Sequence, residues 1–134
     1  IQDIAIAAEQ GGADAVSAIN TIVGMSIDIK TRKVKLSTNY GGLSGPAIHP
    51  IAVANIHKIS KVVSIPIIGI GGIANVNDVI EFLLAGASLV QIGTMCYQNP
   101  NLGPQLKNEL SQYLQENGIK DICDIIGKVE YYSN

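Results

Sequence analysis

Two apolar segments of the sequence end in glycine, where backbone groups rather than side chains could bind a ligand. The segment 65–70 is followed by Gly71–Gly72, and the segment 87–92 is followed by Gly93–Thr94. Glycine lets a backbone approach a ligand closely, and free N–H groups beside a helix start favour an anion such as phosphate. If only one pair of glycines were present, a tight strand-to-helix turn would explain it better. Because two motifs follow successive segments, we interpret them together as a phosphate site.

Polar residues also follow an earlier apolar segment. Asn20 and Thr21 come directly after the segment 13–19. The Asn20 amide offers both a donor and an acceptor, which suits a heterocycle that carries carbonyl and N–H groups. An asparagine that caps a loop is an equally good interpretation of this motif taken alone.

The connection between residues 21 and 45 contains two further candidates. Its end, GGLSGP (41–46), is rich in glycine and is compatible with a lid, with backbone contact to a ligand, or with a plain loop. Its middle is basic, which we interpret as a solvated hairpin face, with a partner surface as the alternative. The basic residues are Lys30, Arg32, Lys33 and Lys35.

The histidines and cysteines give no catalytic pattern. His49 and His57 have no visible Ser, Cys or carboxylate partner, so we interpret both as structural. Cys96 is interpreted as a small buried thiol rather than a nucleophile, and Cys123 as part of a helical core. Two cysteines without metal-ligand spacing predict neither a disulfide framework nor a metal site, and they favour a reducing cytoplasmic setting.

The composition limits the classes of partner. The 134 residues are 47% hydrophobic and 15% charged, with a net charge of −2, which predicts a packed core and gives no electrostatic sign of a nucleic-acid partner. Glycine, proline or serine interrupts the apolar runs before they reach the roughly 18 residues of a membrane span. We therefore expect no nucleic acid and no membrane as partners.

Helical and strand patterns alternate along the chain. Asn75 with Asp78 three residues later predicts a helix start, and Gly86 predicts the end of that helix. The connection 21–45 is expected to contain a small hairpin around 33–39. In all, the pattern predicts helices over 1–10, 46–63, 75–85, 104–116 and 120–129, and strands over 13–20, 65–70 and 87–92.

This alternation predicts an α/β fold with a parallel sheet. A weak internal repeat supports it, since GGADAVSAINT (11–21) and AGASLVQIGT (85–94) both run from Gly-Ala through a strand to threonine. A complete (β/α)8 TIM barrel needs eight strands and about 250 residues. Because the chain opens inside a helix, we expect residues 1–134 to form a single domain that is the C-terminal part of a TIM barrel, incomplete here. A small open sheet is the alternative.

Six collinear segments resemble the C-terminal half of dihydroorotate dehydrogenase. The INT motif followed by SIDIKTRK is more similar to the NAD-linked B-type of class 1 than to the fumarate-linked A-type. The segments are AINT (18–21), GMSIDIKTRK (24–33), GGLSGPAIHPIA (41–52), IPIIGIGGI (65–73), DVIEFLLAGAS (78–88) and VQIGT (90–94).

The resemblance implies FMN-dependent oxidation of dihydroorotate to orotate in pyrimidine biosynthesis, on a TIM barrel. By the same resemblance, Asn20 and Thr21 contact orotate. The residues that it assigns to FMN are Ile19, Gly45, Gly71, Gly72, Gly93 and Thr94, the last four mainly around the phosphate. It also implies a partner subunit that contains FAD and a 2Fe-2S cluster and passes the electrons on to NAD. We expect the catalytic chain to form a homodimer.

The resemblance also implies what this chain lacks. The family's catalytic cysteine and flavin-contacting lysine belong to the first half of the barrel, and no residue here matches them. Cys96 follows the Gly93–Thr94 motif, where the family has no base. We therefore assign no catalytic residue and expect the chain alone to be inactive.

Two other functions remain compatible with the same motifs. One is another phosphate- or flavin-binding TIM-barrel enzyme, such as an isomerase or a synthase. The other is a non-catalytic half-barrel that pairs its exposed sheet edges with a second copy, because unpaired strand edges favour association.

Overall fold

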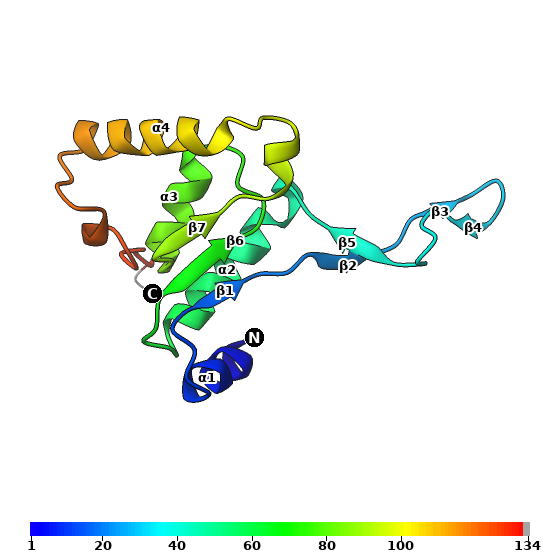
Figure 1. Ribbon diagram of the computed structural model, residues 1–134, viewed down its shortest axis with the longest axis horizontal. Helices are drawn as coiled ribbons and strands as arrows, with labels where there is room; N and C mark the ends of the chain where they lie inside the picture. Colours follow the sequence, from blue (N-terminus) through cyan, green and yellow to red (C-terminus); the bar gives the residue numbers. More distant parts are fainter. Residues whose placement is uncertain (133–134) are drawn as a thin grey trace.

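The computed structural model describes residues 1–132 and contains a parallel sheet in the order β1-β6-β7 (Figure 1). Strand β1 (Val16–Ala18) pairs with β6 (Ile67–Ile70), which in turn pairs with β7 (Leu89–Gln91). The predicted parallel strands are confirmed, although each is shorter than its apolar segment. Because β6 is central, the loop that follows it lies between the loops that follow the other two strands.

Helices join the strands of this sheet and cover one side of it (Figure 1). Helix α2 packs on β1 and β6, α3 packs on α2 and β7, and α4 packs on α3. The helices are α1 (Gln2–Gln10), α2 (His49–Ser60), α3 (Val76–Ala85) and α4 (Leu102–Glu116), with 3-10 turns η1 (Pro46–Ile48), η2 (Thr94–Tyr97) and η3 (Ile122–Asp124). Among residues 1–132 no helix has both the length and the apolar character needed to cross a membrane.

Local chemistry fixes both ends of α3, as the sequence predicts. The Asn75 side chain accepts hydrogen bonds from the backbone N–H groups of Asn77 (2.9 Å) and Asp78 (3.3 Å). The Asp78 carboxylate accepts in return from the Asn75 N–H at 3.1 Å, which completes a capping box. Gly86 ends the helix with a φ of 113°, a left-handed conformation that favours glycine.

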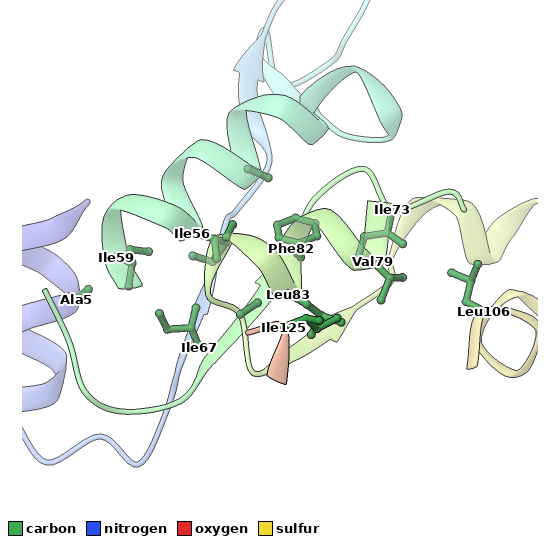
Figure 2. Packing of buried hydrophobic residues seen from close by; sticks show 14 of the residues in the cluster. Ala5, Ile56, Ile59, Ile67, Ile73, Val79, Phe82, Leu83, Leu106 and Ile125 are labelled. Carbon is green, nitrogen blue, oxygen red and sulfur yellow. The ribbon is translucent and has the colours of Figure 1, made fainter. Parts of the chain in front are cut away.

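The core lies between the sheet and its helices (Figure 2). Phe82 and Ile56 have no exposed surface, and a Cβ added to Gly69 of β6 would lie 2.6 Å from the Phe82 ring. The opposite face of the sheet is open, since Leu89 of β7 is 60% exposed. Parallel sheets are normally covered on both faces, and the open face here is the side that faces the interior of a closed barrel.

Residues 22–43 of the connection 21–45 form a long arm that extends away from the sheet (Figure 1). Within it, β2 (Ile22–Gly24) pairs with β5 (Gly41–Leu43), and β3 (Ile27–Asp28) pairs with β4 (Lys33–Val34), both antiparallel. The predicted hairpin around 33–39 is wrong in position. Its turn lies between β3 and β4 because the Asp28 carboxylate accepts from the backbone N–H groups of Lys30 (2.8 Å) and Thr31 (3.0 Å).

The predicted helix over 120–129 is also wrong. The described chain there forms only the short turn η3, begun by the Asp121 side chain, which accepts from the Cys123 N–H at 2.8 Å. Gly127 has a φ of 70°, which no right-handed helix contains, and Ile125 reaches the core from a loop. Cys123 is therefore exposed rather than part of a helical core.

Candidate binding site at the carboxyl ends of the strands

All three predicted motifs lie at the same edge of the parallel sheet. Asn20 follows β1, Gly71–Gly72 follows β6, and Gly93–Thr94 follows β7. Ligands of parallel α/β folds bind at this edge, because the loops and helix starts that follow the strands converge there. The site is thus built by three loops, with the double glycine in the middle.

Protein atoms explain why Gly71 and Gly72 carry no side chain. Gly71 has a φ of 141° and Gly72 a φ of 70°. A Cβ on Gly71 would lie 2.6 Å from the Ala52 Cβ, and one on Gly72 would lie 2.8 Å from both the Gly45 carbonyl oxygen and the His49 Cβ. The two glycines therefore serve a tight turn against α2, and any ligand contact comes from their backbone.

Gly93 differs from the double glycine. A Cβ added to Gly93 would meet no protein atom within 4 Å, so the space beside it is open. The backbone N–H groups of Gly72, Gly93 and Thr94 find no protein acceptor within residues 1–132. Free N–H groups beside open space are what a bound phosphate requires.

The loop that precedes α2 closes one side of this site. Thr94 Oγ1 donates to Ser44 Oγ at 2.8 Å, and a Cβ on Gly45 would lie 3.7 Å from the Thr94 Cγ2. A Cβ on Gly71 would lie 3.7 Å from the Ile19 Cγ1. The structure therefore brings together residues that the sequence places far apart, from the ends of all three strands and from the segment 41–46.

Asn20 and Thr21 line a neighbouring pocket of about 430 Å³. The Asn20 Oδ1 accepts a hydrogen bond from the backbone N–H of the adjacent Thr21 at 2.7 Å. The Asn20 amide nitrogen has no acceptor among the described residues. It remains free to donate to a ligand at the mouth of β1.

His49 has a role at this edge that the sequence analysis missed. It is only 8% exposed, and its Nδ1 lies 3.0 Å from the Gly71 carbonyl oxygen. Its Nε2 lies 3.3 Å from Glu81 Oε2 and 3.7 Å from Asp78 Oδ1, so carboxylate neighbours do exist. These carboxylates belong to another helix, which explains why spacing around His49 gave no signal.

The other chemically active side chains lie outside this site. His57 forms a 2.7 Å hydrogen bond between its Nε2 and the Tyr131 hydroxyl. Cys96 is half-buried in η2, with its Sγ 3.8 Å from the Ile92 carbonyl oxygen. No group of three or more His, Cys, Asp or Glu residues within 1–132 could hold a metal ion.

The fold and site define a part of a (β/α)8 barrel with unpaired backbone N–H groups at the carboxyl ends of two neighbouring strands. The sequence profile of dihydroorotate dehydrogenase matches residues 1–114, and the chain belongs to that family. It corresponds to the C-terminal part of the enzyme.

Relatives of both NAD-linked and fumarate-linked types are similar to the chain. The catalytic subunit of dihydroorotate dehydrogenase B (NAD(+)) from Brachyspira hyodysenteriae is 53% identical over 127 residues, 95% of this chain and 42% of that protein. Dihydroorotate dehydrogenase A (fumarate) from Lactobacillus helveticus is 48% identical over 131 residues, 98% of this chain and 43% of that protein. The chain thus spans about two fifths of the length of these curated relatives.

A solved structure supports the same fold. The crystal structure of the Eimeria tenella enzyme DHODH in complex with ferulenol matches with a TM-score of 0.76 and 28% identity. The match covers 95% of this chain and 34% of that chain. The three parallel strands and their helices are therefore an incomplete TIM barrel, as the sequence predicts.

Proposed function

We propose that the protein to which this chain belongs oxidises dihydroorotate to orotate with FMN, in pyrimidine biosynthesis. The observation that carries the proposal is the open space beside Gly93, next to backbone N–H groups without protein acceptors, in a chain of the dihydroorotate dehydrogenase family. These groups fit a phosphate monoester, because they offer donors and the glycine leaves room for the anion.

The residues divide into a flavin part and a substrate part. Gly71, Gly72, Gly93 and Thr94 would hold the FMN phosphate, and Ile19 and Gly45 would line the rest of FMN. Asn20 and Thr21 would orient the orotate ring through the free Asn20 amide and the neighbouring hydroxyl. FMN, when bound, supplies the hydride acceptor.

This chain contributes binding and orientation, and the base that removes the substrate proton belongs to another part of the barrel. The pocket beside Asn20 is lined by Ser17, Ile19, Thr21 and Ile70, none of which is an ordinary base. We infer that residues 1–134, as a single domain, are inactive alone. Dihydroorotate oxidation by the isolated 134-residue chain would contradict this inference.

We further propose the B-type assembly for the complete protein. The NAD-linked relatives are named catalytic subunits, which favours a second subunit that takes the electrons. By the family resemblance, that subunit would carry FAD and a 2Fe-2S cluster, the catalytic chain would form a homodimer, and both would work in the cytoplasm. Activity with NAD only after addition of the second subunit would support this assignment, and direct activity with fumarate would contradict it.

The test of the activity uses the full-length protein and a matched pair of asparagine variants. Dihydroorotate should bleach the flavin absorbance of the wild type without added oxidant. Asn20→Leu should raise the KM for dihydroorotate about tenfold or more, because a lost hydrogen bond costs about 1–3 kcal/mol. The control, Asn55→Leu on the exposed side of α2, should leave KM unchanged. A wild-type flavin that dihydroorotate fails to reduce would contradict the proposal.

A further inference from the structure

His49 is the one buried side chain among residues 1–132 that is polar or charged. It begins α2, directly beside the loop that follows β6. A buried polar group is costly unless hydrogen bonds compensate it, so the contacts of this ring indicate what it does. Its Nδ1 faces the double glycine, and its Nε2 faces helix α3.

The Nδ1 side of the ring contacts the double glycine. Nδ1 lies 3.0 Å from the Gly71 carbonyl oxygen, and because that oxygen can only accept, Nδ1 carries the hydrogen. A Cβ on Gly72 would lie 2.8 Å from the His49 Cβ and 2.9 Å from its backbone nitrogen. The histidine therefore touches the turn directly, with no room for a side chain between them.

The Nε2 side of the ring contacts the start of α3. Nε2 is buried with no hydrogen-bond partner among residues 1–132, 3.3 Å from Glu81 Oε2 and 3.7 Å from Asp78 Oδ1. The other Asp78 oxygen accepts from the Ala74 backbone N–H at 2.7 Å, just after the double glycine. The Phe82 ring meets the imidazole edge-on, with centroids 5.1 Å apart. The segment 71–75 is therefore held near its start by His49, through the Gly71 carbonyl, and near its end by Asp78, through the Ala74 N–H.

The geometry of one peptide group links His49 to the phosphate site. The Gly71 carbonyl and the Gly72 N–H belong to the same planar trans unit, so they point in opposite directions. When His49 holds the carbonyl on the α2 side, the Gly72 N–H is directed away from α2, and it has no protein acceptor within 1–132. Glycine on both sides of this peptide would otherwise let it rotate easily.

We propose that His49 is a positioning residue for the phosphate site. Its Nδ1–H holds the Gly71 carbonyl so that the Gly72 N–H stays directed at the phosphate monoester of the flavin. The inference rests on the proposed function, because it assumes that the anion at this edge is the FMN phosphate. It assigns a role to a side chain that would contact neither FMN nor dihydroorotate.

Two variants separate the two nitrogens of the ring. His49→Asn places an amide N–H near the position of Nδ1 and removes the Nε2 side. His49→Gln carries its amide further out, towards the carboxylates, and removes the donor to Gly71. The matched controls are His57→Asn and His57→Gln, which change the same residue type in the same helix, away from the strand ends.

The measurement is the dissociation constant of the full-length protein for FMN and for riboflavin, followed by flavin fluorescence. His49→Gln should weaken FMN binding about tenfold or more, because the Gly72 N–H would no longer be held towards the charged phosphate. His49→Asn should bind FMN within about threefold of the wild type, a rescue that a packing role would not produce. Riboflavin, which lacks the phosphate, should bind all variants alike, and the His57 variants should match the wild type for both flavins.

Other outcomes separate this inference from the proposed function. Equal FMN affinity of the two His49 variants, or equal losses for riboflavin and FMN, would overturn the positioning role. If His49→Gln does not fold, His49→Asn decides alone, and a loss of about tenfold or more in its FMN affinity would overturn the role. A wild-type protein that fails to prefer FMN over riboflavin would instead contradict the phosphate site itself.

Discussion

The sheet with its helices and the arm of residues 22–43 use similar apolar residues in opposite ways. Around the sheet, Phe82 and Ile56 are completely buried. In the arm no residue is buried, and Ile29 and Val23 are 89% and 76% exposed. Backbone pairing and a few local side-chain hydrogen bonds hold the arm in shape, and isolated two-stranded ribbons are marginally stable in water.

This contrast assigns different roles to the two regions. The sheet and its helices have a core that holds the strand ends in place, which a binding site requires. The turn at the tip of the arm is organised by one carboxylate, and the backbone N–H groups of Thr31 and Lys30 lower the pKa of Asp28 below its ordinary value. No residue of the arm lines the pocket beside Asn20. The apolar side chains of the arm are exposed instead.

The largest expected difference between the regions is in stability. Phe82→Ala should lower the free energy of unfolding by about 3–5 kcal/mol, because it removes a fully buried ring beneath the sheet. Ile29→Ala in the arm should change it by at most about 0.5 kcal/mol. Urea unfolding of the purified protein checks both, and equal losses would show that the arm has a packed core of its own.

A smaller effect is expected from three glycine variants. Gly12→Ala tests backbone strain alone, because its φ is 89° and a Cβ there meets no atom within 4 Å. It should cost about 1–2 kcal/mol. Gly72→Ala should cost about 1–3 kcal/mol more, because its Cβ would also collide with Gly45 and His49. Gly24→Ala in the arm is the comparison, since its Cβ would make only ordinary contacts, 3.8 Å from the Gly41 carbonyl oxygen and 3.9 Å from the Leu43 Cβ. Melting temperatures in the order Gly72, Gly12, Gly24 from most to least destabilised would agree with this account, and the reverse order would contradict it.

The smallest effect concerns an exposed thiol outside both regions. The hydrogen bond and the negative charge of Asp121 raise the pKa of the Cys123 thiol above its ordinary value. A raised pKa means less thiolate at a given pH, so Cys123 should be alkylated slowly at pH 8 although it is exposed. Asp121→Asn keeps a capping oxygen and removes the charge, and it should speed alkylation. An unchanged rate, measured by mass spectrometry, would exclude the carboxylate as the cause.

The parts of the fold that the sequence predicted correctly depend on local chemistry. The start of α3 follows from Asn75 and Asp78, and its end follows from Gly86, all within a few residues of the features that they determine. The three strands follow from apolar segments of suitable length. Since parallel strands end at one edge, the positions of the Asn20, Gly71 and Gly93 motifs followed from the same pattern.

The errors arise where distant contacts decide the structure. The apolar pattern over 120–129 resembles a helix, but Gly127 and the packing of Ile125 against the core select a loop. The misplaced hairpin in the arm is the exception, because its turn depends on the Asp28 carboxylate, which accepts from backbone N–H groups only two and three residues later. The contacts of His49 with Gly71 and Glu81 join three elements, and no spacing along the chain encodes them.

The central claim is that the backbone after β6 and β7 binds the phosphate of FMN, and flavin selectivity tests it most directly. The full-length protein should bind FMN about 100-fold or more tightly than riboflavin, since several charge-assisted hydrogen bonds are each worth about 1.5–3 kcal/mol. Gly93→Ala, whose Cβ would occupy the open space, should lower that ratio about tenfold while leaving riboflavin binding unchanged. Equal affinities for the two flavins in the wild type, or an unchanged ratio in Gly93→Ala, would contradict the account.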